Sequence, residues 1–450
     1  MPPSDSGEKQ PVIIPRPQHN VSRSHMSKNA QKVLYRLHNH GYQAFLVGGG
    51  VRDLLLGHEP KDFDIATNAS PEEVKDLFRN CRLIGRRFRL AHVHFGRDII
   101  EVATFRAAHD EAEPSDARAV VEDSGRILRD NIYGEIGDDV WRRDFTANAL
   151  YYNIADYSIW DYVDGVEDIR NGVMRLIGDP ETRFREDPVR MLRAVRFAAK
   201  LGFTVHKDTE AAMVELGALL DNVPAARLFD ESLKLFLGGF AHQCFELLQH
   251  YDLFRHLLPA TAAQLETPDG ATFRSMVSAG LTNTDRRVAD DRPVTPMFLF
   301  AVFLWGPIRA QATAIQEAEG GSDPHCLRLA SDEVIRAQQS TISVPRRFTM
   351  PVRDIICMQP AFQRRGRAAR KLLNHPRFRA AYDLMLLRQA AGEVDEETAK
   401  WWTDIQAMDG DAQQAALSQG DDGKRPRRRR RRRSRRGGRG RKGGAAPANT

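Results

Sequence analysis

The stretch Gln43–Thr67, QAFLVGGGVRDLLLGHEPKDFDIAT, is the part of the chain around which the other motifs are arranged. It begins with four apolar residues, Ala44 to Val47, which predict a buried strand. Three glycines follow, and a short helix is expected to run from there to a stop at Gly57. A glycine-rich turn between a strand and a helix lets backbone N–H groups approach a phosphate closely, and the helix N-terminus adds a favourable dipole. The first half of the stretch therefore predicts a phosphate-binding turn.

Two aspartates lie at the end of the same stretch. Asp62 and Asp64 are separated by Phe63, so on a strand the two carboxylates point to one face. Hard divalent cations prefer carboxylate oxygens, and two-metal nucleotidyl transfer needs carboxylates that bridge a pair of cations. The alternative is a solvated turn whose aspartates cap the next helix. Beside the glycine turn, the pair indicates phosphoryl or nucleotidyl transfer.

A third carboxylate is expected at such a site, and the sequence offers two candidates. Glu101 interrupts an apolar, strand-like run, whereas Asp144 follows a pair of arginines. Asp144 could be a metal ligand or could simply hold the neighbouring arginines in place. Arg143 could bind a triphosphate, because a guanidinium matches phosphate oxygens with two donors. Taken alone, Arg142, Arg143 and Asp144 would more often be a surface ion-pair cluster.

A third motif begins at Glu186 and Asp187. Pro188 at a first helical position predicts a helix start, and Gly202 predicts its end. Asp187 and Arg190 can then lie side by side and present an acceptor together with donors. Adenine and cytosine both offer an amino donor beside a ring-nitrogen acceptor, so the pair could read either base. The alternative is a helix-capping aspartate on a salt-bridged helix face.

The segment Leu83–Phe95 interleaves arginines with aromatic residues, a pattern that suits contact with RNA backbone and bases. His92 and His94 have the spacing of metal ligands on a strand. No cysteine or third histidine lies near them, so ordinary strand positions are expected.

Composition divides the chain. Fourteen of its 66 Lys and Arg residues lie between Lys424 and Lys442, which leaves fifty-two against 60 acids and a formal charge of −8 for residues 1–423. The run Arg427–Arg433 cannot be buried, so we expect a disordered tail that binds RNA through its phosphates.

The apolar run Pro296–Trp305 is about half a membrane span and predicts a core helix. Four scattered cysteines without metal-binding spacing are expected to be reduced thiols.

The chain is long enough for two or three domains. Strand patterns mix with helices over its first third, and helical patterns dominate afterwards, apart from an expected connection over residues 259–290 and an expected mobile loop over residues 106–140. The expected organisation is a disordered leader at 1–25, a catalytic head at 26–175, a helical neck at 176–265, a C-terminal helical region at 266–418 and a disordered Arg/Gly-rich tail at 419–450.

In this order, the glycine turn with Arg52, the aspartate pair, the Arg143–Asp144 motif and the Asp187–Arg190 motif resemble the class II nucleotidyltransferases. That superfamily contains tRNA CCA-adding enzymes and bacterial poly(A) polymerases. The segment Leu83–Phe95 looks like the stretch that distinguishes the polymerases, and an Arg-rich C-terminal extension is more typical of them. The resemblance covers approximately residues 30–260.

The resemblance implies an α+β protein with a polymerase-β-like nucleotidyltransferase head, followed by an all-helical neck, body and C-terminal region. It assigns Asp62, Asp64 and Asp144 to catalysis, Asp62 and Asp64 also to the metal, and Gly49, Arg52, Arg143, Asp187, Arg190 and Arg193 to the nucleotide. Glu101 matches a position that can also supply the third carboxylate, so Glu101 and Asp144 stay open as alternatives for that role.

The expected activity is template-independent transfer of AMP from ATP to RNA 3′ ends, with Mg²⁺ as cofactor. A CCA-adding enzyme of the same fold is the first alternative, and a non-catalytic RNA-binding protein is the second. Expected partners are RNA 3′ ends and, through the basic tail, proteins of RNA decay. A cytoplasmic location away from membranes is expected.

Overall fold

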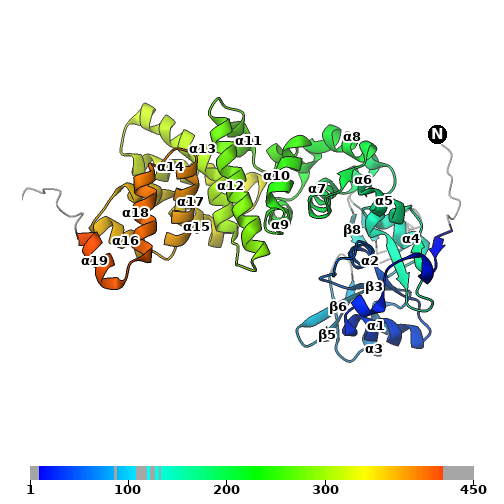
Figure 1. The fold of residues 1–450 in the computed structure, drawn as a ribbon. Helices are drawn as coiled ribbons and strands as arrows, with labels where there is room; N and C mark the ends of the chain where they lie inside the picture. The colour runs from blue at the N-terminus through cyan, green and yellow to red at the C-terminus, as the bar shows by residue number, and fades with distance from the viewer. Residues whose placement is uncertain (1–9, 86–88, 108–118, 122–126, 131–132, 419–450) are drawn as a thin grey trace, which may run out of the picture.

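The computed structural model describes residues 10–85, 89–107, 119–121, 127–130 and 133–418 (Figure 1). An eight-stranded mixed sheet forms the N-terminal part, in the order β1-β10-β9-β2-β3-β6-β5-β4. Strand β2 lies near its centre, antiparallel to β3 and β9, while β3 and β6 are parallel. The strands are β1 Val12–Ile14, β2 Ala44–Val47, β3 Asp64–Thr67, β4 Cys81–Ile84, β5 Leu90–Phe95, β6 Asp98–Thr104, β9 Leu150–Asn153 and β10 Ile159–Asp161.

Helices α1 (Lys28–Asn39) and α3 (Pro71–Leu77) cover one face of this sheet. Val33, Leu34 and Leu37 recur at helical spacing on α1 and are buried in one core with alternate residues of the strands. Because successive strand residues point to opposite faces, Asp64 and its neighbours in register face the other side of the sheet. The sheet therefore separates a helix-covered face from the face that bears the predicted aspartate.

The N-terminal segment corrects one expectation. A disordered leader over residues 1–25 is wrong for residues 10–25, since Val12–Ile14 forms an edge strand antiparallel to Ile159–Asp161 and Val21 is fully buried. The partner strand lies far along the chain, so no local pattern reveals this pairing. Residues 1–9 lie outside the described part of the chain.

Helices make up nearly all of the chain after the head, which confirms the expected fold class (Figure 1). They extend away from the sheet, with α7 to α10 between the head and the helices that follow. Short elements within the head part are α2 Gly49–Leu55, β7 Ala119–Val121, β8 Ile127–Asp130, α4 Ile136–Arg142, α5 Gly165–Asn171 and β11 Val173–Met174. Strand β11 pairs in parallel with the two-residue strand β12 Thr204–Val205, which lies between α7 and α8. The later helices are α6 Pro180–Glu186, α7 Val189–Leu201, α8 Lys207–Leu216, α9 Ala225–Phe236, α10 Ala241–His250, α11 Pro259–Leu265, α12 Gly270–Ala289, α13 Pro296–Glu319, α14 Asp323–Thr341, α15 Arg346–Cys357, α16 Arg367–Leu373, α17 Phe378–Ala390, α18 Glu396–Ala407 and α19 Gly410–Ser418.

Residues 259–290 are not the expected connection but helices α11 and α12. Pro259 and Gly270 are the first residues of these two helices, so residues that suggested a loop mark helix starts instead.

Helix α13 contains the long apolar run. It is long and apolar enough to cross a membrane by length and composition, but Phe300, Phe303 and Trp305 are buried in the helical core. The prediction of a core helix is confirmed. The four cysteines are all free, as expected.

Candidate active site

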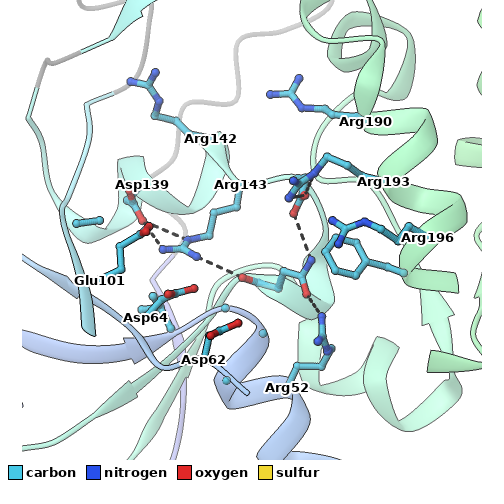
Figure 2. A pocket seen from close by; sticks show the side chains of 18 of the residues that line it. Arg52, Asp62, Asp64, Glu101, Asp139, Arg142, Arg143, Arg190, Arg193 and Arg196 are labelled. Atoms are coloured by element: carbon cyan, nitrogen blue, oxygen red, sulfur yellow. Dashed lines mark hydrogen bonds and ion pairs between the residues drawn. The ribbon is translucent and has the colours of Figure 1, made fainter. Parts of the chain in front are cut away.

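A cavity of about 780 Å³ lies between the open face of the head sheet and helices α6, α7 and α9 (Figure 2). Every residue that the sequence singled out for the site lines this cavity, although the residues come from seven separate elements or turns. They are Gly49, Arg52, Asp62, Asp64, Glu101, Arg143, Asp144, Asp187, Arg190 and Arg193.

The carboxylates of Asp62, Asp64 and Glu101 gather on the head side of the cavity (Figure 2). Asp64 is the first residue of β3, and Glu101 lies on β6, the parallel neighbour of β3. Asp64 opens into the cavity but lies deep within it. This burial, followed by the charges of Glu101 and Asp62, raises the pKa of Asp64 from 3.8 to about 6, and Arg143 opposes the shift.

These carboxylates suit a divalent cation, because they are hard oxygen donors whose mutual repulsion a cation would relieve. Among the described residues, no three acidic, histidine or cysteine side chains form a ready-made metal cage. The geometry therefore suits a cation that completes its coordination shell with water and substrate phosphate.

The raised pKa of Asp64 predicts a measurable stability effect. Since its folded pKa exceeds its ordinary value, the charged form costs stability above about pH 6, and the cost vanishes as both states become protonated below about pH 4. Asp64→Asn is expected to raise the melting temperature of metal-free protein at neutral pH, with a gain that disappears towards pH 4. Thermal unfolding across pH measures this, with Asp76→Asn on the exposed side of α3 as control. A gain that is independent of pH would contradict the account.

The glycine turn lies directly beside two arginines. Gly48 has φ +67° and ψ −133°, a backbone conformation that residues other than glycine rarely adopt. A Cβ on Gly48 would lie 3.4 Å from Arg143 Nη1, and one on Gly49 would lie 3.3 Å from Arg52 Nη2. The glycines thus let the backbone and both guanidinium groups share one corner of the cavity.

Gly48→Ala is expected to lower the free energy of unfolding by about 1–3 kcal/mol, because alanine is strained at this φ. Chemical denaturation measures the change. Gly137→Ala in α4 is the matched control: its Cβ would meet nothing within 4 Å, and it is expected to be neutral or stabilising by up to about 1 kcal/mol. Equal effects of both substitutions would show that the conformation of Gly48 is not restrictive.

Arg52 and Arg143 are held in place before any ligand binds. Arg52 is only 2% exposed and donates from Nε and Nη2 to Asp53 Oδ1, at 2.8 and 2.6 Å. Arg143 Nη2 donates to Asp139 Oδ2 at 3.0 Å, and its Nε donates to Tyr151 Oη at 2.7 Å. Burial alone would lower the pKa of Arg143, but Tyr151 and Asp139 outweigh it and raise the pKa. Two fixed positive charges therefore flank the glycine turn.

Two residues that sequence reasoning missed organise this corner. Asp139 lies in α4, within residues 106–140 that were expected to be a mobile loop, and it is 7% exposed. Its spacing of four residues from Arg143 was the available signal. Asn148 accepts from Arg52 Nη1, donates to Asp144 Oδ1 at 3.3 Å and accepts on its backbone oxygen from Arg143 at 3.4 Å.

Asp144 faces the neck rather than the other carboxylates. Its Oδ2 accepts from Arg193 Nε at 2.7 Å and also from Arg193 Nη2, while its Oδ1 accepts from the Phe145 N–H at 2.9 Å. Burial would raise its pKa, but the ion pair with Arg193 dominates and lowers it. Asp144 thereby ties the head to α7, whereas Glu101 is the carboxylate that adjoins Asp64.

Asp187 and Arg190 lie at the junction of α6 and α7. Asp187 Oδ2 accepts from Arg227 Nη2 of α9 at 2.7 Å, and its Oδ1 accepts from the Val189 N–H at 3.3 Å. Arg190 Nη1 donates to Glu186 Oε2 at 2.7 Å. Helix α7 begins at Val189, one residue later than expected, and ends before Gly202 as expected. The ion-pair alternative holds here, in a place that still faces the cavity, whereas Pro188 and not Asp187 is the N-cap residue of α7.

Arginines of α4 and of the neck helices make much of the cavity wall positive (Figure 2). Burial, followed by the charges of Arg106 and Arg183, lowers the pKa of Arg142 to about 10. Burial and the charge of Arg193 also lower the pKa of Arg196, whose buried Nε has no hydrogen-bond partner within the described part of the chain. The cavity thus presents arginines opposite carboxylates, an arrangement that suits a polyphosphate bound with a cation.

One predicted motif lies partly, and another wholly, outside the described part of the chain. Residues 86–88 of the segment Leu83–Phe95 and the run Arg427–Arg433 lie outside the described residues. His92 and His94 lie on β5 as expected, and His92 Nε2 lies 3.3 Å from Glu101 Oε2.

Comparisons with known proteins agree with this geometry. Three family models match: "Poly A polymerase head domain" over residues 44–175, "Probable RNA and SrmB- binding site of polymerase A" over 202–265 and "Polymerase A arginine-rich C-terminus" over 319–436. The chain is 47% identical over 422 residues to poly(A) polymerase I of Salmonella typhimurium, covering 92% of this chain and 90% of the relative. Poly(A) polymerase I of Haemophilus influenzae is 46% identical, with 90% of each chain covered.

CCA-adding enzymes are more distant relatives. The enzyme of Leuconostoc mesenteroides is 39% identical over 229 residues, which cover 51% of this chain and 54% of the relative. The solved structure of the Thermotoga maritima CCA-adding enzyme complexed with tRNA has a TM-score of 0.56 at 20% identity, covering 86% of this chain and 82% of that one. At this identity the structure shows a shared fold.

Proposed function

This chain belongs to the poly(A) polymerase I family, and we propose from that premise that it adds AMP from ATP to RNA 3′ ends without a template. One observation of the structure carries the proposal: the Asp62–Asp64–Glu101 carboxylates face buried arginines across a single cavity. In this reaction the RNA 3′ oxygen bonds to the α-phosphorus of ATP, and the bond from that phosphorus to pyrophosphate breaks.

The carboxylates are proposed to hold Mg²⁺, which fits their oxygen donors and the absence of a complete protein cage among the described residues. Bound there, Mg²⁺ would supply Lewis acidity to the phosphate oxygens and lower the pKa of a coordinated hydroxyl. Asp62 and Asp64 help to activate the RNA 3′-hydroxyl. We propose Glu101 as the third carboxylate, because its charge acts on Asp64, and Asp144 as a positioning residue for Arg193.

The triphosphate is proposed to lie over the glycine turn at Gly49. Arg52 and Arg143 are fixed beside that turn by Asp53, Asp139 and other partners, so they present positive charge without being reorganised. Such preorganised charge stabilises the negative charge that moves onto the leaving pyrophosphate.

The base is proposed to be read by Asp187 and Arg190, with Arg193 beside them. Arg227 fixes the Asp187 carboxylate and Glu186 fixes the Arg190 guanidinium, so both readers are rigid. This pair could accept adenine or cytosine, and the choice of adenine rests on family membership.

An extension assay with a short unstructured RNA tests the proposal. With ATP as the only nucleotide, we expect a ladder of products and release of pyrophosphate, and with CTP alone we expect little or no extension. Addition of CTP and then ATP restricted to tRNA would identify the CCA-adding activity instead. In sequence, the CCA-adding enzyme of Leuconostoc mesenteroides aligns with only about half of this chain.

Three further features are proposed. We propose a cytoplasmic location, proteins of RNA decay as partners of the basic tail, and the division into head, neck, C-terminal region and tail at residues 175, 265 and 418. Limited proteolysis of the full chain tests the division through the positions of the first cuts.

A further inference from the structure

A second hollow, of about 800 Å³, lies on the helix-covered face of the head sheet. Its wall is one side of α1, and its other side is formed where α3 and β5 end. Its lining includes Lys28, Lys32, Arg36, Phe78 and Phe95. We call this hollow the α1 groove. It is separated from the active-site cavity by the sheet.

A row of positive charge follows the α1 groove. Lys28, Lys32 and Arg36 recur every four residues, so they project from one side of the helix about 6 Å apart along its axis. All three are exposed, and within the described part of the chain none forms an ion pair with a carboxylate. Helix α1 contains no acidic residue. Packing of the head requires only the opposite, apolar side of α1, so the row is not explained by the fold.

Aromatic rings form the floor beneath two of these cations. The Lys32 ammonium lies 5.8 Å from the centre of the Phe95 ring, and the Arg36 guanidinium lies 5.2 Å from that of Phe78. A cation over a ring face is attracted to it and loses part of its freedom of movement. The charges are therefore held along the groove before a ligand arrives.

We propose that the α1 groove binds the sugar-phosphate backbone of single-stranded RNA upstream of the 3′ end that occupies the active site. The inference rests on the proposed function. Three cations at regular intervals match the successive phosphates of an extended strand, and binding to phosphates requires no particular sequence.

Strand β5 connects the two places. Leu90 at its start lines the active-site cavity, and Phe95 at its end lines the α1 groove. Five residues of strand span about 17 Å. An RNA strand that passes around the β4–β5 edge must also cross from one face of the sheet to the other, so the test uses an RNA long enough to reach both places. An RNA whose 3′ end occupies the active site must continue away from it, and the α1 groove can hold that continuation. An acidic protein segment has no part that enters the active site, so RNA is the favoured occupant.

The test compares the full-length chain with a Lys28→Gln, Lys32→Gln, Arg36→Gln variant. Glutamine keeps helix propensity and removes only the charge. The matched control replaces Lys75, Lys207 and Arg170, which are exposed and line neither the cavity nor the α1 groove, by glutamine. Binding of oligoadenylates of about 4 and about 24 nucleotides is measured without ATP, as a function of salt, with thermal unfolding as a check of folding.

The groove variant is expected to bind the longer RNA about tenfold more weakly, with a salt slope reduced by about 2, since each phosphate contact on a single strand contributes about 0.7. The short RNA and the control variant are expected to bind as the unchanged protein does. Unchanged binding of the long RNA by the groove variant would overturn the proposal, and this is also the result expected if the groove binds an acidic protein instead. An equal loss of binding in the control variant would overturn it as well. If the groove variant unfolds, cross-linking of the long RNA to the unchanged protein replaces this test. Cross-links to α1 are then the expected result, and their absence would overturn the proposal. Failure of the proposed function is distinguishable, because the unchanged protein would then not extend RNA at all.

Discussion

Replacing Asp62 and Asp64 together by asparagine is expected to reduce AMP incorporation into RNA by at least about a thousandfold. The cation proposed to bind these carboxylates would supply several kcal/mol of transition-state stabilisation, and each 1.36 kcal/mol corresponds to a factor of about ten. RNA affinity is expected to persist, because the arginines of the neck and tail remain. Initial rates of ATP incorporation and a separate RNA-binding measurement check the two expectations.

Asp76→Asn, an exposed substitution on α3, is the control for this experiment and should leave the rate unchanged. The double variant also separates the enzyme from a non-catalytic RNA-binding protein. If cells that carry only the double variant keep their normal RNA metabolism, catalysis is not the biological role of this chain.

The two candidates for the third carboxylate are expected to fail in different ways. Glu101→Gln should lower kcat about a hundredfold, or about 2.7 kcal/mol, without loss of stability, because it removes a metal-side oxygen and a charge that repels Asp64. Asp144→Asn should instead destabilise the fold by about 2 kcal/mol, because Arg193 loses its buried partner while remaining partly exposed.

The two substitutions are matched, since each replaces a carboxylate by its isosteric amide. Chemical denaturation and steady-state kinetics are measured on both. A loss of kcat in Asp144→Asn at unchanged stability, together with an active Glu101→Gln, would transfer the role of third carboxylate to Asp144.

Local patterns were sufficient to predict the elements that carry the site. The apolar run before three glycines predicted β2 and the turn, and Pro188 and Gly202 bounded α7 to within a residue. The aspartate pair was predicted from its spacing together with the glycine turn, and both residues line the cavity although β3 begins only at Asp64 and Asp62 lies before it. These signals succeed because they depend on neighbours in the chain.

Other features depend on distant partners and left no local signal. Strand β1 forms because it pairs with the edge of β10. The buried carboxylate of Asp139 accepts hydrogen bonds from Arg143 and Tyr151. The sequence could not tell Glu101 from Asp144, because the difference lies in which one faces Asp64 and which one faces Arg193. Such differences depend on contacts between residues that are far apart in the sequence.

This chain is expected to add adenylate, and only adenylate, to RNA 3′ ends in general. The most direct test of this expectation offers all four nucleoside triphosphates at equal concentration to a mixture of an unstructured RNA and a tRNA that lacks its 3′-terminal CCA, and sequences the added nucleotides. The account predicts runs of A on both RNAs. Addition of CCA to the tRNA, with the other RNA left unextended, would contradict it.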